Sequence, residues 1–394
     1  MLNGPFSPWP SFTEEEANAV STVLLSNKVN YWTGQECREF EQEFARFAGS
    51  EYAIALANGT LALDLALRGL GIGPGDEVVV TPRTFLASVS SIVTAGAVPV
   101  FAEVDADSQN ITAETVAAVL TERTRAVICV HLAGWPCDMD PIMDLAAMHD
   151  LFVIEDCAQA HGASYKGRAV GSIGHVGCWS FCQDKIMTTG GEGGAVTCKD
   201  RNLWSRMWSY KDHGKSWSAV YERQHPTGFR WLHESFGTNW RMTEMQGVIG
   251  RIQLARMPEW RKARQRNANA IWACARNLPG LRVPELPADI EHAAYKCYVF
   301  VEPNRLAEGW SRDRIQNAIV EAGVPCFSGS CSEVYLEKAF DKTDWRPKTP
   351  LSVAHELGET SLMFLVHPTL TDGEIGKTCD VLASVMKQAV PADV

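Results

Sequence analysis

Lys185 is the first residue in this sequence whose setting suggests covalent chemistry. It follows the apolar run Trp179-Ser180-Phe181 and precedes a glycine-rich stretch at 190–194. Such glycines let the backbone turn tightly or pass close to a bulky group. A lysine whose ammonium pKa is lowered by its surroundings can form a Schiff base. The alternative is a surface lysine before a hairpin, which is what most lysines are.

Two further segments follow expected strands and suit parts of a cofactor. Asn58-Gly59-Thr60 lies between an expected strand and a helix, where free N–H groups, the small Gly59 and the Thr60 hydroxyl suit a phosphate. Asp156 lies at the carboxyl end of an expected strand, where ligands bind in open α/β sheets. A carboxylate there can keep a pyridinium nitrogen protonated. Each segment is also explained by a helix N-cap.

An aromatic residue completes the set. Phe85 follows the apolar run 77–80 and could stack on a flat ring, although a core or hairpin-edge phenylalanine is the simpler explanation for it alone. Together the four segments offer a phosphate site, a stacking ring, a partner for a ring nitrogen and an amine. Pyridoxal 5'-phosphate (PLP) needs all four, and few other cofactors do. The sequence therefore predicts a PLP site where strands end.

Competing cofactor sites fit the sequence less well. The glycines at 71–75 follow an expected helix and include Pro74, the reverse of the strand-then-helix context of a dinucleotide loop. The glycines at 171–177 have the wrong spacing, and neither G-x-x-x-x-G-K-[ST] nor H-E-x-x-H occurs. No cysteine and histidine cluster has zinc-finger spacing, so no metal site is predicted.

The residues that position these groups show an alternation of strand and helix patterns. Helices are expected at 60–70, 88–95, 113–120 and 141–149, between apolar strands at 52–56, 77–80, 98–101, 126–130 and 151–154. Nearly continuous apolar strands between amphipathic helices indicate a mainly parallel sheet covered on both faces. The fold class is therefore α/β.

The length of 394 residues exceeds one ordinary core, so two domains are expected. We expect a large cofactor-binding domain at 1–255, opened by a capping-box pattern at 13–16, and a smaller C-terminal α+β domain at 256–394. A long helix is expected at 243–277, with Pro258 breaking or kinking it. The stretch 204–236 is interpreted as loop and short helix near a polar site.

Composition excludes several classes of protein. The net charge of −11 argues against nucleic acid or an anionic membrane as the main partner. No run is long enough to span a bilayer, and the start at Met1 has no secretory pattern. The twelve cysteines form no C-x-x-C pair and are interpreted as reduced thiols in a cytoplasmic protein.

Taken in order, the motifs of this chain resemble those of the DegT/DnrJ/EryC1/StrS family of sugar aminotransferases. The resemblance runs from about Phe40 to the final helix and rests on 58–60, 82–85, 155–163, 180–185, 190–194 and 237–242. It implies a type I, aspartate aminotransferase-like PLP fold and a homodimer with active sites at the subunit interface. It also implies glutamate as amino donor and a nucleotide-linked keto-sugar, often a 4-keto-6-deoxy sugar, as acceptor.

The resemblance also implies a role for each matching residue. Lys185 is similar to the Schiff-base lysine and proton shuttle, and Asp156 to the partner of the pyridine nitrogen. Gln159 resembles the contact to the ring hydroxyl, and Phe85 the stacking aromatic. The residues that resemble phosphate ligands are Gly59, Thr60, Ser180 and, lent by the neighbouring subunit, Asn239. Weaker candidates for substrate contacts are Lys211, His213, His233 and Arg241, for which a solvated charged loop is the alternative.

Some features differ from the family pattern or leave alternatives open. Asp184 precedes Lys185 where Thr or Asn is commoner, and its carboxylate favours the charged form of the lysine unless it points away. Other acceptors are a 3-keto sugar or a cyclitol ketone. Other functions are a sugar dehydratase, which in this family replaces the lysine with histidine, and a non-catalytic regulator, against which Lys185 and Asp156 argue.

Overall fold

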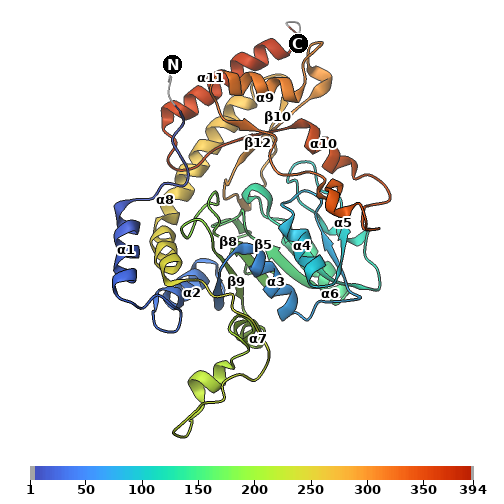
Figure 1. Cartoon of the computed structure of the whole chain (residues 1–394). Helices are drawn as coiled ribbons and strands as arrows, with labels where there is room; N and C mark the ends of the chain where they lie inside the picture. Colours follow the sequence, from blue (N-terminus) through green and yellow to red (C-terminus); the bar gives the residue numbers. More distant parts are fainter. Residues whose placement is uncertain (1–4, 392–394) are drawn as a thin grey trace.

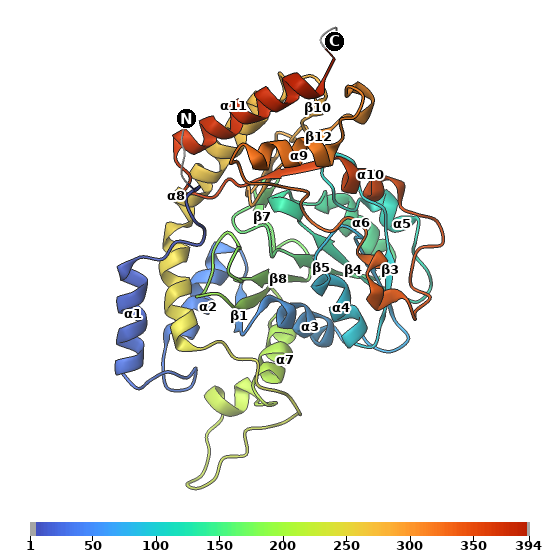
Figure 2. The same ribbon diagram turned by 45° about the horizontal axis from the view of Figure 1, so that its top comes forward.

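A computed structural model describes residues 5–391 of the chain, shown in Figures 1 and 2. The chain start at Met1–Gly4, on which the expectation about a secretory signal partly rests, lies outside the described residues. In the described part, no helix has both the length and the apolar character needed to cross a membrane. All twelve cysteines are free thiols, most of them buried.

The large sheet has seven strands, in the order β1-β9-β8-β5-β4-β2-β3. Their bounds are β1 (Tyr52–Leu56), β2 (Glu77–Val80), β3 (Val98–Phe101), β4 (Thr124–Val130), β5 (Phe152–Asp156), β8 (Val176–Ser180) and β9 (Gly194–Cys198). Strands β3, β2, β4, β5 and β8 run parallel, whereas β9 is antiparallel to both of its neighbours. The predicted mainly parallel α/β sheet is confirmed.

Helices cover both faces of this sheet, as its nearly continuous apolar strands require. One face packs on α3 (Gly59–Gly69), α4 (Ala87–Thr94) and α7 (Arg201–Lys211). The other face packs on α5 (Ala113–Ala117), α6 (Met139–Met148) and, towards β1 and β8, α2 (Glu36–Phe47). The strands of this sheet that carry predicted site residues at their ends therefore lie between two helical layers.

A smaller antiparallel sheet lies above the large one in Figure 1. It contains β10 (Leu281–Arg282), β12 (Cys297–Val301), β14 (Ser361–Phe364) and β13 (Cys326–Phe327), with α9 (Arg312–Glu321), α10 (Ser352–Thr360) and α11 (Asp372–Ala389) around it. A short third sheet of β6 (Ser164–Tyr165), β7 (Arg168–Ala169) and β11 (Ile290–Glu291) joins the large part of the chain to the segment before β12.

One long helix, α8 (Glu244–Ala275), serves both parts of the fold. It contributes Met257 to the apolar cluster beside α2 and Ile271 to the cluster of the smaller sheet. Pro258 was expected to break or kink this helix; the break is wrong, since the helix runs through Pro258. Packing at both ends outweighs one lost hydrogen bond. Helix α1 (Glu14–Leu25) lies beside α8 and begins with the predicted capping box at Thr13.

The connection from α7 to α8 leaves the body of the molecule as a projecting arm, residues 213–239 (Figures 1 and 2). The arm contains a short π-helical turn, η2 (Ser218–Glu222). The sequence-based interpretation of 204–236 as loop and short helix holds for the arm but not for its start, since α7 extends to Lys211.

Candidate active site

Seven of the eight residues predicted to hold the cofactor line one cavity of about 960 Å³, and Asn239 is the exception. Its walls are the start of α3, the turn after β2, the ends of β5 and β8, and the residues around β12 and β13. The carboxyl ends of the parallel strands meet there, as expected for an open α/β sheet. The segment 295–298 closes the cavity from the side of the smaller sheet.

At one end of the cavity, the start of α3 meets the end of β8. Asn58 caps the helix, because its Oδ1 accepts a hydrogen bond from the N–H of Leu61 at 3.0 Å. A Cβ atom at Gly59 would lie 2.5 Å from the Cβ of Ser180, so only glycine fits this close approach. Thr60 is exposed and lines the cavity. The cap explanation is therefore correct for Asn58, and it leaves Gly59, Thr60 and Ser180 grouped at a helix N-terminus, which suits an anion.

Asp156 ends β5 with its side chain buried and held in place. Its Oδ2 accepts from the Ser88 hydroxyl at 2.8 Å, and its Oδ1 accepts from the N–H of Ala158 at 3.1 Å. It also lines the cavity. A buried carboxylate with a fixed orientation beside a cavity can pair with a protonated ring nitrogen. Sequence analysis did not identify Ser88, which only the packing of α4 brings to this strand end.

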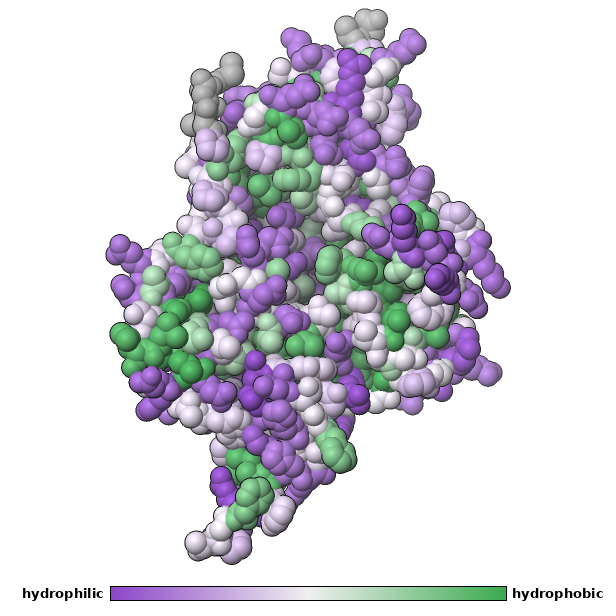
Figure 3. All heavy atoms as spheres, in the orientation of Figure 1, coloured by the Kyte–Doolittle hydropathy of each residue, from purple (hydrophilic) through white to green (hydrophobic). Residues whose placement is uncertain are grey.

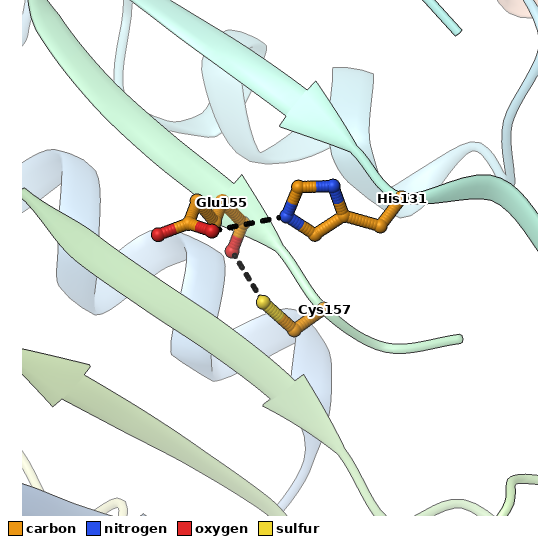
Figure 4. Close-up of side chains that lie close together, drawn as sticks. All are labelled: His131, Glu155 and Cys157. Carbon is orange, nitrogen blue, oxygen red and sulfur yellow. Dashed lines mark hydrogen bonds and ion pairs between the residues drawn. The ribbon is translucent and has the colours of Figure 1, made fainter. Parts of the chain in front are cut away.

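A second buried carboxylate, next to Asp156, has a different role. Glu155, His131 and Cys157 are called here the Glu155 cluster, and Figure 4 shows them at the ends of β4 and β5. The carboxylate accepts the backbone N–H groups of Gly171, Ile173 and Gly174 at 2.7–2.8 Å. Each of its oxygens thus already accepts at least one hydrogen bond.

The protonation state of His131 follows from its two contacts. Its Nδ1 accepts the N–H of Cys137 at 3.0 Å, so its Nε2 carries the proton and donates to Glu155 Oε2 at 3.1 Å. Burial raises the pKa of Glu155, but His131 and the backbone N–H groups outweigh it and hold that pKa below its usual value. Since its oxygens and both ring nitrogens are occupied by hydrogen bonds, the Glu155 cluster is a scaffold for the strand end and not a metal site.

Gln159 and Phe85 line the cavity from its other sides. The Oε1 atom of Gln159 accepts the N–H of Ala133 at 2.8 Å, which orients the side-chain amide and leaves its NH₂ group as the donor. Phe85 is 71% exposed although it is a large apolar side chain. An aromatic ring exposed inside a cavity is a typical stacking surface for a flat ligand.

Lys185 lies on the loop after β8, with its side chain 17% exposed. The indole N–H of Trp9 donates to the Lys185 carbonyl oxygen at 2.8 Å, which ties the N-terminal segment to this loop. The Nζ atom lies 4.0 Å from Asp184 Oδ1 and 5.2 Å from the ring centroid of Tyr295. The lysine is thus held by contacts on both of its sides and points into the cavity.

The Asp184 side chain is shared between neighbours. Its Oδ2 accepts a hydrogen bond from the Tyr295 hydroxyl, so the carboxylate does not pair with Lys185 alone. Burial raises the pKa of Asp184, but the charge of Lys185, the Tyr295 hydrogen bond and the charge of Lys296 together lower it below its usual value. Sequence analysis did not identify Tyr295 or Lys296. The one sequence feature that could have identified Lys296 is its position directly before the apolar strand 297–301.

The structure does not bring Asn239 or the four weaker substrate candidates to this cavity. Asn239 and His213 are exposed at the base of the arm, and His233 is exposed further along it. Arg241 pairs with Asp212 at 2.8 Å. Lys211 is fully buried, 3.7 Å from Glu41 and 3.9 Å from the ring centroid of Tyr31. Contact of Lys211 with a substrate conflicts with this burial, because the ammonium group is turned into the core.

The grouped residues fit PLP. Gly59, at the N-terminus of α3, lies close to Ser180 at the end of β8. A fixed carboxylate, an exposed aromatic ring and a lysine line the same cavity. These features match the phosphate, the ring nitrogen, the ring face and the aldehyde of that cofactor.

Comparison with known proteins agrees with this class of site. Residues 10–383 match the DegT/DnrJ/EryC1/StrS aminotransferase family. The GDP-perosamine synthase of Caulobacter vibrioides is 44% identical over 356 residues, covering 88% of this chain and 89% of that protein.

Solved structures agree as well. The aminotransferase from Psychrobacter cryohalolentis is 65% identical, with a TM-score of 0.95 and coverage of 97% of this chain and 99% of that one. The PLP form of the putative sugar aminotransferase Spr1654 from Streptococcus pneumoniae is 25% identical, with a TM-score of 0.86 and coverage of 98% and 99%. The fold and site therefore define a PLP-dependent sugar aminotransferase. The chain belongs to the DegT/DnrJ/EryC1/StrS family.

Proposed function

We propose that this enzyme transfers the amino group of L-glutamate to a nucleotide-linked keto-sugar, a 4-keto-6-deoxyhexose in the first instance. The observation that carries the proposal is the convergence of Lys185, Asp156 and Phe85 on one cavity that is also open to a substrate. The likeness to a GDP-perosamine synthase supports this acceptor class. The product would enter surface polysaccharide or secondary-metabolite biosynthesis.

The chain's own groups have distinct tasks in this proposal. PLP supplies an aldehyde that carries the amino group and a ring that withdraws electrons. The Lys185 amine would hold that aldehyde. When free, its Nζ would take a proton from the α-carbon of the donor as a general base and give a proton up again as a general acid. Asp156 keeps the ring nitrogen protonated throughout.

The remaining site residues bind and orient the cofactor. Gly59, Thr60 and Ser180 hold the phosphate at the start of α3, with backbone N–H groups and hydroxyls as donors. The NH₂ group of Gln159 donates to the ring hydroxyl, and Phe85 stacks on the ring face. This arrangement is supported by the common cavity and by the free face of Phe85.

A homodimer with shared active sites accounts for the residues outside the cavity. The arm carries Phe229, Trp231 and Phe236, which are 76%, 81% and 99% exposed, and Figure 3 shows apolar side chains on this projection. Exposed aromatic residues of this size mark an interaction surface. In the proposed dimer the arm packs on the second subunit and lends Asn239 to its phosphate site, while His213, His233 and Arg241 lie near its substrate.

The expected location is the cytoplasm, which the twelve unpaired cysteines support, since such compartments keep thiols reduced. The alternative acceptors are a cyclitol ketone and a 3-keto sugar. No observation on the chain favours a dehydratase, because Lys185 is present.

The test is the absorption spectrum of the purified protein before and after addition of glutamate. We expect a visible band from the bound cofactor, its loss to the near ultraviolet with glutamate, and its return when a nucleotide-linked keto-sugar is added. The Lys185→Ala variant should lose turnover by at least about 1,000-fold, since it removes both the attachment point and the proton carrier. A band that the variant leaves unchanged would refute the role of Lys185.

A further inference from the structure

A second lysine, Lys296, lines the cavity close to Lys185. It follows the buried Tyr295 and directly precedes β12. Its Nζ lies 4.7 Å from the Tyr295 ring centroid, and the Nζ of Lys185 lies 5.2 Å from the same centroid. The two nitrogens are therefore at most about 10 Å apart. Two cations thus share one aromatic neighbour beside the cavity.

A third cation, Arg264, lies behind them. Its side chain comes from α8, is 1% exposed, and places Nη1 3.4 Å from the Tyr295 carbonyl oxygen. Among the residues that the structure describes, its Nε and Nη2 have no hydrogen-bond partner. Its guanidinium lies 4.9 Å from the Trp9 ring centroid, which is an aromatic contact and not a counter-charge. We call Lys296 and Arg264 the cation wall.

Negative charge near the cation wall is scarce. Asp184, Arg264 and Lys185 act on Lys296, and Asp184 is the one carboxylate among these three. The titratable His367 also interacts with both Lys296 and Arg264. Burial, with the charges of Arg264 and Lys185, lowers the pKa of Lys296 to about 8 against the opposing effect of Asp184. Burial also lowers the pKa of Arg264 to about 9.

Asp156, Glu192 and Glu337 also line the cavity, but within the described residues none of them forms an ion pair with Lys296 or Arg264. Asp184 is itself engaged, because its two oxygens face the Tyr295 hydroxyl and Lys185. A buried excess of positive charge is costly unless an anion completes it. Since this excess borders a cavity, the missing anion is a ligand group and not a side chain.

We infer that Lys296 binds a carboxylate of the amino donor, with Arg264 behind it making the wall attractive to anions. The inference rests on the proposed function and names the group that recognises the donor. An α-amino acid must place its nitrogen where the Lys185 amine lies, and its α-carboxylate is then only two bonds away. A dicarboxylic donor reaches further with its second carboxylate. A cation near Lys185 is thus placed for the donor's carboxylate.

The diphosphate of a nucleotide-linked sugar is the competing anion. A hexose ring separates its phosphates from the ketone carbon that must reach the reacting nitrogen. The α-carboxylate of the donor lies closer to the reacting nitrogen than the diphosphate does, which favours the donor as the partner of a cation that shares the Tyr295 ring with Lys185. Binding of a nucleoside diphosphate is made an arm of the test for this reason.

The test measures binding to the PLP-loaded enzyme by calorimetry, so it needs no turnover. Glutarate, a dicarboxylate without an amine, is the probe for the donor, and guanosine diphosphate is the probe for the acceptor. The variants are Lys296→Met, Lys296→Gln and Lys296→Arg, with Lys262→Met, an exposed lysine on α8, as the matched control. Circular dichroism and the cofactor spectrum check that each variant folds and loads.

We expect glutarate affinity to fall about 10- to 100-fold in Lys296→Met and Lys296→Gln, which is the usual size of a charge-assisted contact. Lys296→Arg should restore most of it, and Lys262→Met should leave it unchanged. Guanosine diphosphate affinity should change less than about twofold. In the unmodified enzyme, glutarate affinity should also weaken as the pH rises above about 8, where Lys296 loses its proton.

Three results would overturn the inference: no glutarate binding to the unmodified enzyme, equal binding by Lys296→Met, or an effect that falls on guanosine diphosphate instead. The pH series keeps the test decisive if the variants fold poorly. Failure of the proposed function has a different signature, because glutamate would then leave the cofactor spectrum unchanged while glutarate binding still depended on Lys296.

Discussion

Two groups of charged residues lie beside the site cavity, and they are built in opposite ways. In the Glu155 cluster, the carboxylate accepts three backbone N–H groups and the His131 N–H, and His131 accepts a fourth backbone N–H. In the cation wall, Arg264 has two nitrogens without a partner in the described part of the chain, and Lys296 has little counter-charge. The hydrogen bonds of the Glu155 cluster are complete, whereas those of Arg264 are not, and Lys296 in front of Arg264 lines the cavity.

The difference separates two roles that residue type alone does not separate. A buried charge whose hydrogen bonds are complete holds the backbone, so its loss should cost stability. A buried charge beside a cavity that lacks hydrogen-bond partners or counter-charge can bind a ligand. Removing such a residue should therefore weaken ligand binding. Adjacent residues can differ in their access to the cavity: Asp156 lines it although each of its oxygens accepts a hydrogen bond, whereas Glu155 does not line it.

The largest effect on stability should follow from Glu155→Ala. This change leaves three backbone N–H groups and the His131 N–H without their acceptor, inside a fully buried site. Breaking such a buried charged network typically costs about 3–5 kcal/mol of unfolding free energy. Urea denaturation measures this, with Glu122→Ala, an exposed glutamate, as control. A loss no larger than in the control would mean that the Glu155 cluster is not the scaffold.

Asp156→Asn should give the reverse result. The asparagine Oδ1 can still accept a hydrogen bond, so the unfolding free energy should change by less than about 1 kcal/mol. It can no longer hold a protonated ring nitrogen by charge, so turnover should fall about 100- to 1,000-fold. Denaturation and single-turnover kinetics on the same preparation compare the two effects. Equal loss of turnover in Asp156→Asn and in a stability-matched variant would remove the distinction.

The cation wall should also affect a neighbouring histidine. His161 is fully buried with its ring 5.3 Å from that of Trp179, and burial, with the charges of Lys185 and Arg264, lowers its pKa to about 3. The unfolded chain binds a proton there below about pH 6.5, whereas the folded protein does not until about pH 3. Stability contributed by the neutral ring is thus present above pH 6.5 and is lost as the pH falls.

His161→Phe should therefore flatten the acid limb of the stability profile. At pH 5 the unmodified protein should have lost about 2 kcal/mol through this residue, relative to pH 7.5. Between pH 7.5 and pH 5, the unfolding free energy of the variant should fall by about 2 kcal/mol less than that of the unmodified protein. The check is urea denaturation at a series of pH values, and an unchanged slope would show that His161 is protonated in the folded state.

Local patterns predicted part of this site, and residues distant in the sequence supplied the rest. Gly59, Asp156 and Lys185 each lie where a strand ends, so short-range patterns identified them. Lys211 looked like a loop cation because its counter-charge, Glu41, lies 170 residues away in the chain. Lys296 was missed for a related reason, since its neighbours Asp184 and Arg264 come from a loop and a helix that only the fold brings together.

The same reasoning explains why Pro258 does not break its helix. Propensity predicted a break or a kink there, but packing on two apolar clusters, one for each end of α8, keeps the helix continuous. The alternation of strands and helices was predicted more accurately than this helix. Each strand of the large sheet is only four to seven residues long and mostly buried, so a short apolar run is enough to indicate it. Tertiary contacts decide what short patterns leave open, and buried charge is the most sensitive to them.

Tyr295→Phe should produce the smallest effect and addresses the boundary between the two groups. The Tyr295 hydroxyl donates to Asp184, and burial with the Asp184 charge and hydrogen bond raises its own pKa. Without that hydroxyl the carboxylate is freer to pair with Lys185 or Lys296. We expect kcat/KM for glutamate to fall about three- to tenfold, as for the loss of one hydrogen bond to a charged group. The pH–rate profile should shift to higher pH, because a closer carboxylate favours the charged form of the lysines and raises their pKa. Loss of activity without that shift would mean that the hydroxyl acts through packing alone. Asp184 would then belong with the Glu155 cluster and not with the cation wall.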